Sequence, residues 1–554
     1  MSEAREINSA PLTPRTGPTT PRTHPISAPP SQYHSPSLSR SPLLSFTDND
    51  EPINGVDGHD KTPKTTSRPR TPSHFISPLA SPLRKVLTPI ASPLRRAMTP
   101  IASPLMNVLN MTKLDPQDAW LPITECRNGN ALYAAFHTLC SGIGVQALVL
   151  PVAFTILGWT WGIICLTVAF IWQLYTLYLL VHLHESHETG LRYSRYISLC
   201  IAAFGEKVAK PIAMLPIIYL SAGTGVLLIS IAGATCKILF QILCEPETCT
   251  ARHLTLVEWY IVLTCAAVLI SQLPNLNSIA GVSLIGAITA IGYITLIWVV
   301  SVVRHNVPGV SYAPVRSESG IKNVFTILNA FGIISFAFRG HNLILEIQAT
   351  MPSCEKHPSR VPMWKGVKYA YVLVAMCLYP ISIGGYWAYG NQIPRDWGML
   401  TVLYKFHGRD TSKFILALSA LFLIINALSS YQIYSMPIFD DMESKYTIRK
   451  KQPCPPWLRA LLRVVHGCIT FFFAVAFPFL ASFAGLLGGV ALPLTLAYPC
   501  FMWAIIKKPK VFGPSWWLNW GLGVLGMILS GLLIAAGIFV MIANGVEFSF
   551  FKPQ

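Results

Sequence analysis

Three ionisable side chains lie close together in one otherwise apolar segment, which reads Phe338-Arg-Gly-His-Asn-Leu-Ile-Leu-Glu-Ile-Gln348. On membrane-insertion scales an Arg or Asp at a helix centre costs roughly 2.5–3.5 kcal/mol, so such residues need a function or a partner. We expect His341 and Glu346 to bind or relay a proton, and Arg339 to hold or screen an anionic group. The alternative is an Arg339–Glu346 ion pair that only holds the helices together.

A glycine, Gly340, separates two of these residues, and a helix broken there would expose backbone groups. Carriers bind their substrates near the bilayer midplane with such discontinuous helices. Free N–H groups at a half-helix N-terminus suit a carboxylate, and free carbonyls suit an ammonium group. We therefore include Gly340 and Asn342 in a candidate substrate site.

A second interruption, Ser141-Gly-Ile-Gly-Val-Gln146, precedes Pro151 in the first apolar segment. Each glycine lowers helix stability by about 1 kcal/mol relative to Ala, and proline removes a backbone donor. Paired weak points five helices apart are typical of an inverted repeat of two five-helix halves. We expect Gly142, Gly144 and Gln146 to line the site; the alternative is close helix packing through small residues.

Two further segments offer polar walls. The third apolar segment contributes Tyr219 and Thr224, and the eighth contributes Ser430 and Tyr434. Hydroxyl groups often bond only to their own helix, which is the alternative for each of them. The sequence contains no phosphate-binding loop, His-Glu-x-x-His or Gly-x-Ser-x-Gly motif, and no Cys/His spacing typical of zinc. We therefore expect neither an enzyme nor a bound cofactor or metal.

The composition indicates a membrane protein. Of 554 residues, 52% are hydrophobic and only 12% are charged, about half the fraction of a soluble protein. The net charge of +17 could suggest a nucleic-acid partner. However, Lys and Arg lie in the N-terminal region and in short loops between apolar segments, where they set membrane orientation. We expect a lipid bilayer around the chain and no nucleic-acid partner.

Residues 1–112 are rich in Ser, Thr and Pro, so we expect a disordered tail that cannot bury enough apolar surface to fold. An eleven-residue repeat begins at Ser81, Ser92 and Ser103, with Ser-Pro, Thr-Pro and a basic pair in each full unit. Proline-directed kinases could phosphorylate it and detach a basic segment from anionic lipid. The alternative is a repetitive spacer.

Residues 113–554 are predicted to form an all-helical transmembrane domain of about eleven helices. The predicted spans are 131–157, 161–184, 209–242, 256–273, 278–303, 321–350, 364–389, 413–440, 458–483, 485–506 and 517–543. The Lys and Arg bias favours a cytoplasmic N-terminus and, with an odd helix count, a C-terminus outside. Cys244 and Cys249 flank a polar loop that this topology places outside, where a disulfide can form. The alternative is two unrelated thiols.

Four motifs together resemble those of the plant amino acid/auxin permease family, most closely its lysine/histidine-transporter-like branch. They are Gln272-Leu-Pro-Asn-Leu-Asn-Ser-Ile-Ala-Gly, Gly340-His-Asn-Leu-Ile-Leu-Glu-Ile-Gln-Ala-Thr-Met-Pro, Ser430-Tyr-Gln-Ile-Tyr-Ser-Met-Pro and Tyr498-Pro-Cys-Phe-Met-Trp. The resemblance covers roughly residues 113–554. It implies the fold of sodium-coupled leucine carriers and amino acid uptake driven by protons. It also implies a substrate between helices 1, 3, 6 and 8, at Gly144, His341 and Glu346.

The chain departs from that family at two positions. Gly144-Val145-Gln146 stands where members usually have Gly-Ala-Gly, and Arg339 stands where many have a small residue. Both departures weigh against simple lysine or histidine specificity. The leading hypothesis is a proton-coupled amino acid symporter of neutral or broad specificity in the plasma membrane. The alternatives are a carrier of an auxin-like acid or other small amphoteric molecule, and a membrane amino acid sensor.

Overall fold

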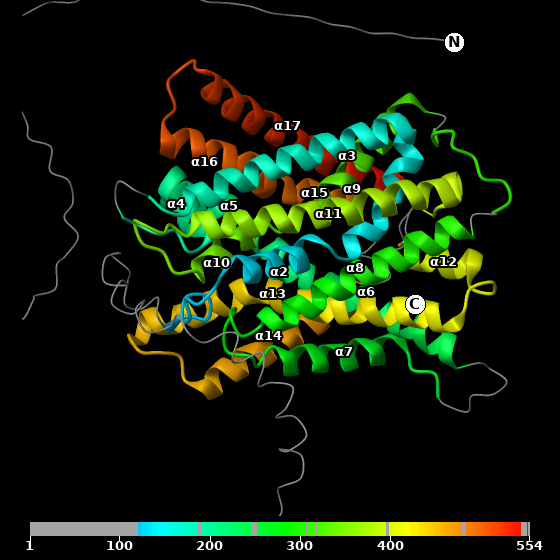
Figure 1. The fold of residues 1–554 in the computed structure, drawn as a ribbon, viewed down its shortest axis with the longest axis horizontal. Helices are drawn as coiled ribbons and strands as arrows, with labels where there is room; N and C mark the ends of the chain where they lie inside the picture. Colours follow the sequence, from blue (N-terminus) through cyan, green and yellow to red (C-terminus); the bar gives the residue numbers. More distant parts are fainter. Residues whose placement is uncertain are drawn as a thin grey trace, which may run out of the picture. The chain divides into compact units, whose positions relative to one another are not determined.

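The computed structural model describes residues 120–186, 190–244, 252–304, 307–316, 319–394, 398–477, 484–543 and residue 551. The predicted tail, residues 1–112, and Cys249 lie outside the described residues. The described part is helical, with an isolated bridge between Glu185 and Arg192 but no strand. Figure 1 shows the helices, which run mostly side by side.

The elements that carry the candidate site come from both halves of the chain. The first half comprises α2 (Ala131–Gly142), η5 (Val145–Val149), α3 (Leu150–Leu183), α4 (Tyr196–Phe204), α5 (Glu206–Ile218), η6 (Tyr219–Gly223), α6 (Thr224–Leu243), α7 (Leu256–Ile270) and α8 (Ala280–Val303). The second half comprises α9 (Gly320–Ala337), η7 (His341–Leu343), α10 (Ile344–Ala349), α11 (Arg360–Tyr389), η8 (Gly390–Gln392), α12 (Met399–His407), α13 (Lys413–Lys450), α14 (Pro456–Ala476), α15 (Ala484–Leu492), η10 (Pro493–Ala497), α16 (Tyr498–Lys507) and α17 (Pro514–Ala543).

Nine helical stretches in the described residues are long and apolar enough to cross a membrane. One of them, Ala131–Leu183, has 53 residues and bends at Gly158, whose φ is 73°. Only glycine adopts this left-handed conformation readily, and 53 residues are enough for two crossings. Counting that stretch twice and adding the shorter apolar helix α7 gives the eleven crossings that the sequence predicts.

The predicted interruptions in the first and sixth crossings are confirmed. α2 ends at Gly142 and the helix resumes at Leu150, after the short 3₁₀ turn η5. α9 ends at Ala337, and Gly340 has a φ of 117° before η7 and α10 continue the crossing. The left-handed backbone at Gly340 explains why a glycine stands among the charged residues, since a Cβ there would be strained.

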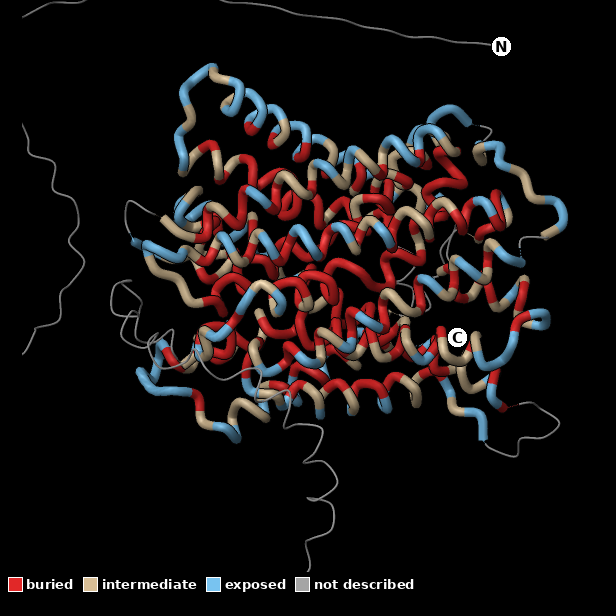
Figure 2. Tube along the Cα trace, in the orientation of Figure 1, coloured by how far each residue is buried: buried red, intermediate tan, exposed pale blue. Residues whose placement is uncertain are grey.

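The two broken crossings lie in the interior of the bundle. α2 contacts α8, α11 and α13, while α10 contacts α2 and α3. Figure 2 shows buried residues gathered along these central elements and exposed residues along α17. Outward-facing apolar side chains such as Leu215 and Leu269 are more than 70% exposed, which suits contact with lipid chains. The interior location means that polar groups at the breaks must be satisfied by protein or substrate.

We predict that Gly340→Ala lowers thermal stability and abolishes uptake. A side chain forced into the left-handed region costs about 1–3 kcal/mol, and relief of that strain would close the break. The matched control is Gly531→Ala in α17, where an added Cβ meets no atom within 4 Å. Uptake in cells and the melting temperature of purified protein measure both effects. Equal behaviour of the two variants would contradict the account.

Candidate functional site

The break after α2 frees three backbone carbonyls, and each accepts a hydrogen bond from a side chain. Ser430 Oγ donates to the Cys140 carbonyl (2.9 Å), and the Tyr434 hydroxyl donates to the Ser141 carbonyl (2.8 Å). Gln146 Nε2 donates to the Gly142 carbonyl (3.1 Å). The last carbonyls of a helix have no intrahelical partner, so α13 and Gln146 together stabilise the open end of α2.

The alternative that these hydroxyls bond only to their own helix is therefore wrong for Ser430 and Tyr434. The neighbouring Ser429 does bond to its own helix, since its hydroxyl donates to the Ile425 carbonyl (2.8 Å). The hydroxyl groups find different partners because they lie on different faces of α13. Ser430 and Tyr434 are four residues apart and project from one side of the helix, toward α2, where unpaired carbonyls compete for their protons.

Arg339 lies between the two breaks. Its Nη2 donates to Gln146 Oε1 (3.0 Å), and its guanidinium carbon lies 4.6 Å from the Phe336 ring centroid and 5.7 Å from that of Tyr434. These are distances of cation–π contacts. The residue is only 2% exposed, yet Nε and Nη1 have no hydrogen-bond partner in the described part of the chain. Two buried charged donors are thus free to bind an anionic group.

The alternative Arg339–Glu346 ion pair is not formed. Glu346 Oε1 accepts instead from the backbone N–H of Tyr196, at the start of α4 (3.3 Å). Its other oxygen, Oε2, is buried and has no hydrogen-bond partner among the described residues. The three ionisable residues of the sixth crossing therefore have separate partners, although they lie within eight positions of the sequence.

Two amide oxygens complement the free donors. Asn426 Nδ2 donates to the Gly286 carbonyl (2.9 Å) and Asn342 Nδ2 donates to Ser221 Oγ (3.1 Å). Both carbonyl oxygens, Oδ1, are buried and unpartnered in the described structure. Asn426 Oδ1 is 3.5 Å from where a Cβ on Gly144 would lie, so it faces the first break. Amide oxygens are acceptors, which suits an ammonium group.

The sequence analysis missed Asn426. Its position could have been found from α13 itself, because Asn426 precedes Ser430 and Tyr434 at intervals of four residues. Residues spaced in this way form a polar stripe along one helix face. The stripe faces the end of α2, where Ser430 and Tyr434 bind the freed carbonyls.

His341 contacts α3. Its Nε2 lies 3.0 Å from Thr176 Oγ1, and the Thr176 hydroxyl donates to the Gln173 carbonyl (2.9 Å). The contact between Nε2 and Thr176 thus ties the ring of His341 to α3. His341 is completely buried. The sequence-predicted proton-coupling residues, His341 and Glu346, thus occupy different surroundings, one against α3 and one against α4.

The third crossing is irregular beside the second break. Tyr219–Gly223 forms a π-helical turn, η6, and Thr224 follows it with only 2% exposure. Such turns are rare in helices and are frequent at functional sites. Ser221 in this turn accepts the hydrogen bond from Asn342. The structure thus places the turn that contains Tyr219 against the sixth crossing, through the contact of Ser221 with Asn342.

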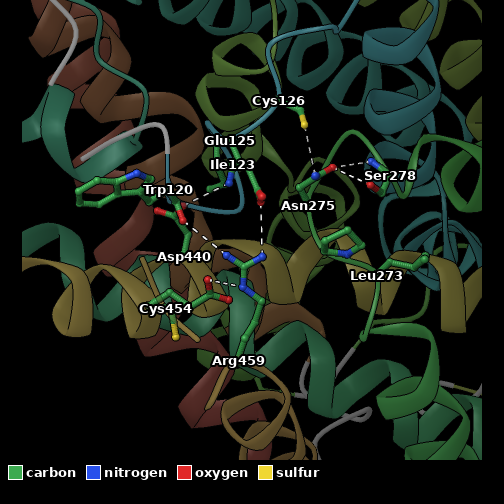
Figure 3. Close-up of polar contacts among 12 residues, drawn as sticks. Trp120, Ile123, Glu125, Cys126, Leu273, Asn275, Ser278, Asp440, Cys454 and Arg459 are labelled. Atoms are coloured by element: carbon green, nitrogen blue, oxygen red, sulfur yellow. Dashed lines mark hydrogen bonds and ion pairs between the residues drawn. The ribbon is translucent and has the colours of Figure 1, made fainter. Parts of the chain in front are cut away.

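An ion pair that the sequence analysis missed closes one end of the site. Arg195, just before α4, pairs with Asp440 of α13. Asp440 Oδ1 also accepts from the backbone N–H of Ile123 (3.3 Å), and Figure 3 shows this contact. Tyr196 binds Glu346 of α10, and its neighbour Arg195 pairs with Asp440 of α13. Both α10 and α13 are therefore anchored to the start of α4.

A second cluster, of ion pairs around Arg459, links the same end of the site to α14. Arg459 pairs with Glu443 (2.9 Å) and with Glu125 (3.4 Å), and it also contacts the Trp120 carbonyl (3.5 Å). Arg463 donates to the Ser271 carbonyl (2.6 Å). Figure 3 shows Arg459 between α13 and the segment of residues 120–126. We call residues 120–126 the strap, since these contacts hold the chain before α2 onto α13 and α14.

Cys244 is buried at the end of α6. Cys244 is disulfide-bonded, but its proposed partner, Cys249, lies outside the described residues, so the pairing with Cys249 stays a prediction. Among the residues that the structure describes, no group of three or more His, Cys, Asp or Glu side chains is arranged to hold a metal ion.

A helical bundle whose first and sixth membrane crossings break at a buried polar cluster has the architecture of a secondary transporter. The chain belongs to the transmembrane amino acid transporter protein family, whose model matches residues 127–543. It is therefore a multi-pass membrane protein and an amino acid transporter, not an enzyme. The resemblance to the lysine/histidine-transporter-like branch is confirmed by the relatives.

Lysine histidine transporter-like 8 of Arabidopsis thaliana is 51% identical over 548 residues, covering 99% of this chain and 98% of that protein. Lysine histidine transporter-like 7 of the same plant is 44% identical, covering 79% and 90%. Among solved structures, a nucleobase-cation-symport-1 family transporter in a closed conformation with bromovinylhydantoin bound aligns at 12% identity. Its TM-score is 0.49, and the alignment covers 78% of this chain and 96% of that one.

We predict that Asp440→Asn loosens the strap and exposes Cys126, which is half-buried and accepts a contact from Asn275. Removing one partner of a buried ion pair costs about 3–5 kcal/mol, because it leaves the other charge unpaired. Maleimide labelling, read residue by residue in a mass spectrometer, should rise several-fold at Cys126 and stay unchanged at exposed Cys265. Desolvation by burial raises the pKa of the Cys126 thiol, so slow labelling is expected in the parent protein.

The matched control is Asp441→Asn, which removes the neighbouring carboxylate from an exposed pair with Lys445. Exposed pairs contribute about 0–1 kcal/mol, so this variant should label like the parent protein. Equal labelling of Cys126 in both variants would contradict the role of Asp440.

Proposed function

We propose that this chain is a proton-coupled symporter of neutral amino acids, or of a broad set of them, in the plasma membrane of a plant cell. In this proposal the N-terminus is cytoplasmic and the C-terminus is outside. The observation that carries it is the buried guanidinium of Arg339 beside two broken helices. Two of its donors, and two neighbouring amide oxygens, have no partner among the residues that the structure describes. The names of the two relatives described above, both lysine histidine transporter-like proteins, support amino acids as substrates.

A zwitterion complements this arrangement. Its carboxylate would accept a charge-assisted hydrogen bond from Arg339, at Nη1 or at Nε, which lie on different edges of the guanidinium and have no partner among the described residues. Its ammonium group would donate to Asn426 Oδ1 and Asn342 Oδ1. Both oxygens are buried, and an unsatisfied buried polar group costs about 1–3 kcal/mol. A bound amino acid would therefore satisfy three groups that the described residues leave unpaired: one Arg339 donor and the two asparagine oxygens.

The charge of Arg339 favours neutral side chains on the substrate. A second positive charge about 4 Å from the guanidinium would be repelled by about 4 kcal/mol at an effective dielectric constant of 20. That repulsion corresponds to about a thousandfold in affinity. A lysine side chain would have to point away from Arg339, whereas an apolar side chain meets no such repulsion.

Proton coupling is assigned to Glu346 and His341. Glu346 Oε2 is the carboxylate oxygen without a partner, and it is the atom at which a proton would be held. Its other oxygen is bound by Tyr196, next to Arg195 of the closing ion pair. A proton arriving at Oε2 would change the charge beside Arg195 and Asp440. We propose that this change links protonation to opening of the strap end of the site.

A second candidate is a carrier of an auxin-like acid or another small amphoteric molecule. The two free donors of Arg339 favour it, since they bind a carboxylate whether or not an ammonium group is present. The asparagine oxygens argue for the amino acid, because an acid without an ammonium group would leave them unpaired. Phosphorylation of the tail by proline-directed kinases also stays a proposal.

Uptake in oocytes tests the function. We expect inward currents and labelled uptake of neutral amino acids that are several-fold larger at about pH 5.5 than at about pH 7.5. We expect Glu346→Gln, which mimics a permanently protonated carboxyl group, to remove that pH dependence while substrate binding persists. The control is Glu258→Gln, in the capping box at the start of α7. Proton-driven uptake by Glu346→Gln like that of the parent would contradict the assignment.

Arg339→Gln tests the carboxylate site. Losing a charge-assisted hydrogen bond costs about 1.5–3 kcal/mol, so uptake of neutral amino acids should fall by about tenfold or more. Arg339→Lys keeps the charge but loses the planar fork, so it should restore only part of the activity. Surface biotinylation controls for the amount of protein. Full activity with an unchanged KM in Arg339→Gln would show that the substrate carboxylate is bound elsewhere.

A further inference from the structure

A groove outside the candidate site lies at one end of α11. It is lined by His182 at the end of α3 and, on α11, by Arg360, Trp364, Lys365, Lys368 and Tyr369. Lys507, the last residue of α16, acts electrostatically on His182 and so adds a further positive charge nearby. Figure 1 shows the last turns of α3 and α16 and the first turn of α11 at the same end of the bundle. None of the lining residues is acidic.

The lysines have no counter-charge within the described part of the protein. Lys365, Lys368 and Lys507 are exposed and make no hydrogen bond or ion pair there. Like charges held close together repel one another. A cluster of this kind is stabilised by an anion, and the N-terminus of the 30-residue helix α11 adds the positive end of a helix dipole.

Trp364 and Tyr369 form an aromatic wall of the same groove, and further rings pack beside Trp364. Tyr178 packs edge-on against Trp364, with ring centroids 5.3 Å apart, and its centroid is 4.0 Å from the His182 ring. Trp503 of α16 lies further along, 6.5 Å from Tyr178. Trp and Tyr are enriched where membrane helices meet the headgroup layer. The wall thus marks the depth at which lipid headgroups surround the protein.

The face of α11 beyond the groove is apolar and exposed. Val372 is 61% exposed and Met376 is 64% exposed, and they continue the row of Lys365 and Lys368 along the helix. Residues three or four apart lie on one helix face. A molecule bound by the lysines would therefore extend an apolar part along Val372 and Met376. This combination of charged and apolar contacts is that of a phospholipid.

We propose that the groove binds the phosphate headgroup of an anionic phospholipid, with an acyl chain along Val372 and Met376. Basic pockets between membrane helices bind such headgroups on the cytoplasmic side, where anionic lipids concentrate. The proposed orientation puts the first turn of α11 on that side. The inference does not depend on the substrate, because none of the groove residues belongs to the candidate transport site.

The test uses the purified full chain in phosphatidylcholine with added phosphatidylglycerol, and retained lipid is measured by native mass spectrometry. The parent protein should retain phosphatidylglycerol. The triple variant Lys365→Gln/Lys368→Gln/Lys507→Gln should retain at least about tenfold less, since each basic residue attracts anionic lipid. The corresponding triple replacement of the same lysines by arginine should retain it like the parent.

The matched control removes three positive charges elsewhere, in Lys207→Gln/Arg449→Gln/Lys450→Gln. These residues are exposed and lie on α5 and α13. If both glutamine variants lose lipid equally, the attraction is general and the groove proposal is wrong. It is also wrong if the groove variant retains lipid like the parent, or if soluble glycerol phosphate displaces the lipid completely. The last result would identify a soluble anion as the ligand.

Discussion

The guanidinium of Arg339 is the group on which the rest of the site depends. It is buried inside the membrane-spanning bundle, where a charge is costly unless it is paired, and its partners among the described residues are Gln146 and the rings of Phe336 and Tyr434. The surrounding features follow from this position. Gly340 provides the left-handed turn beside it, and α13 satisfies the carbonyls that the facing break leaves open. A substrate carboxylate would complete the pairing.

The contacts around the Arg195–Asp440 pair connect the crossing of the candidate substrate site with the carboxylate that would hold a proton. Tyr196 and Arg195 are adjacent, and one holds Glu346 while the other pairs with Asp440. The strap before α2 contacts Asp440 through Ile123 and contacts Arg459 through Glu125. The first crossing, the sixth crossing and α13 therefore meet at a few polar contacts. Each of these contacts is weak enough, at a few kcal/mol, to be broken and re-formed in a transport cycle.

Local sequence features predicted the breaks but not their partners. Glycines in apolar segments and a following proline are local signals, and the structure places both interruptions where they stand. Gln146 and Arg339 are 193 residues apart, and Ile123 and Asp440 are 317 apart. No local pattern specifies such contacts, so the strap and Arg195 were missed. The own-helix alternative for Ser430 failed for the same reason, because the carbonyl that competes for its proton belongs to Cys140, on α2.

The most direct measurement of the central claim is ligand-induced thermal stabilisation of the purified protein with three related molecules. They are L-alanine, ethylamine, which lacks its carboxylate, and propionate, which lacks its ammonium group. A ligand at one hundred times its Kd stabilises the folded state by about 2.7 kcal/mol. The account predicts that alanine raises the melting temperature, that propionate does so more weakly and that ethylamine has no effect. Stabilisation by ethylamine equal to that by alanine would contradict it, because Arg339 would then not bind the carboxylate.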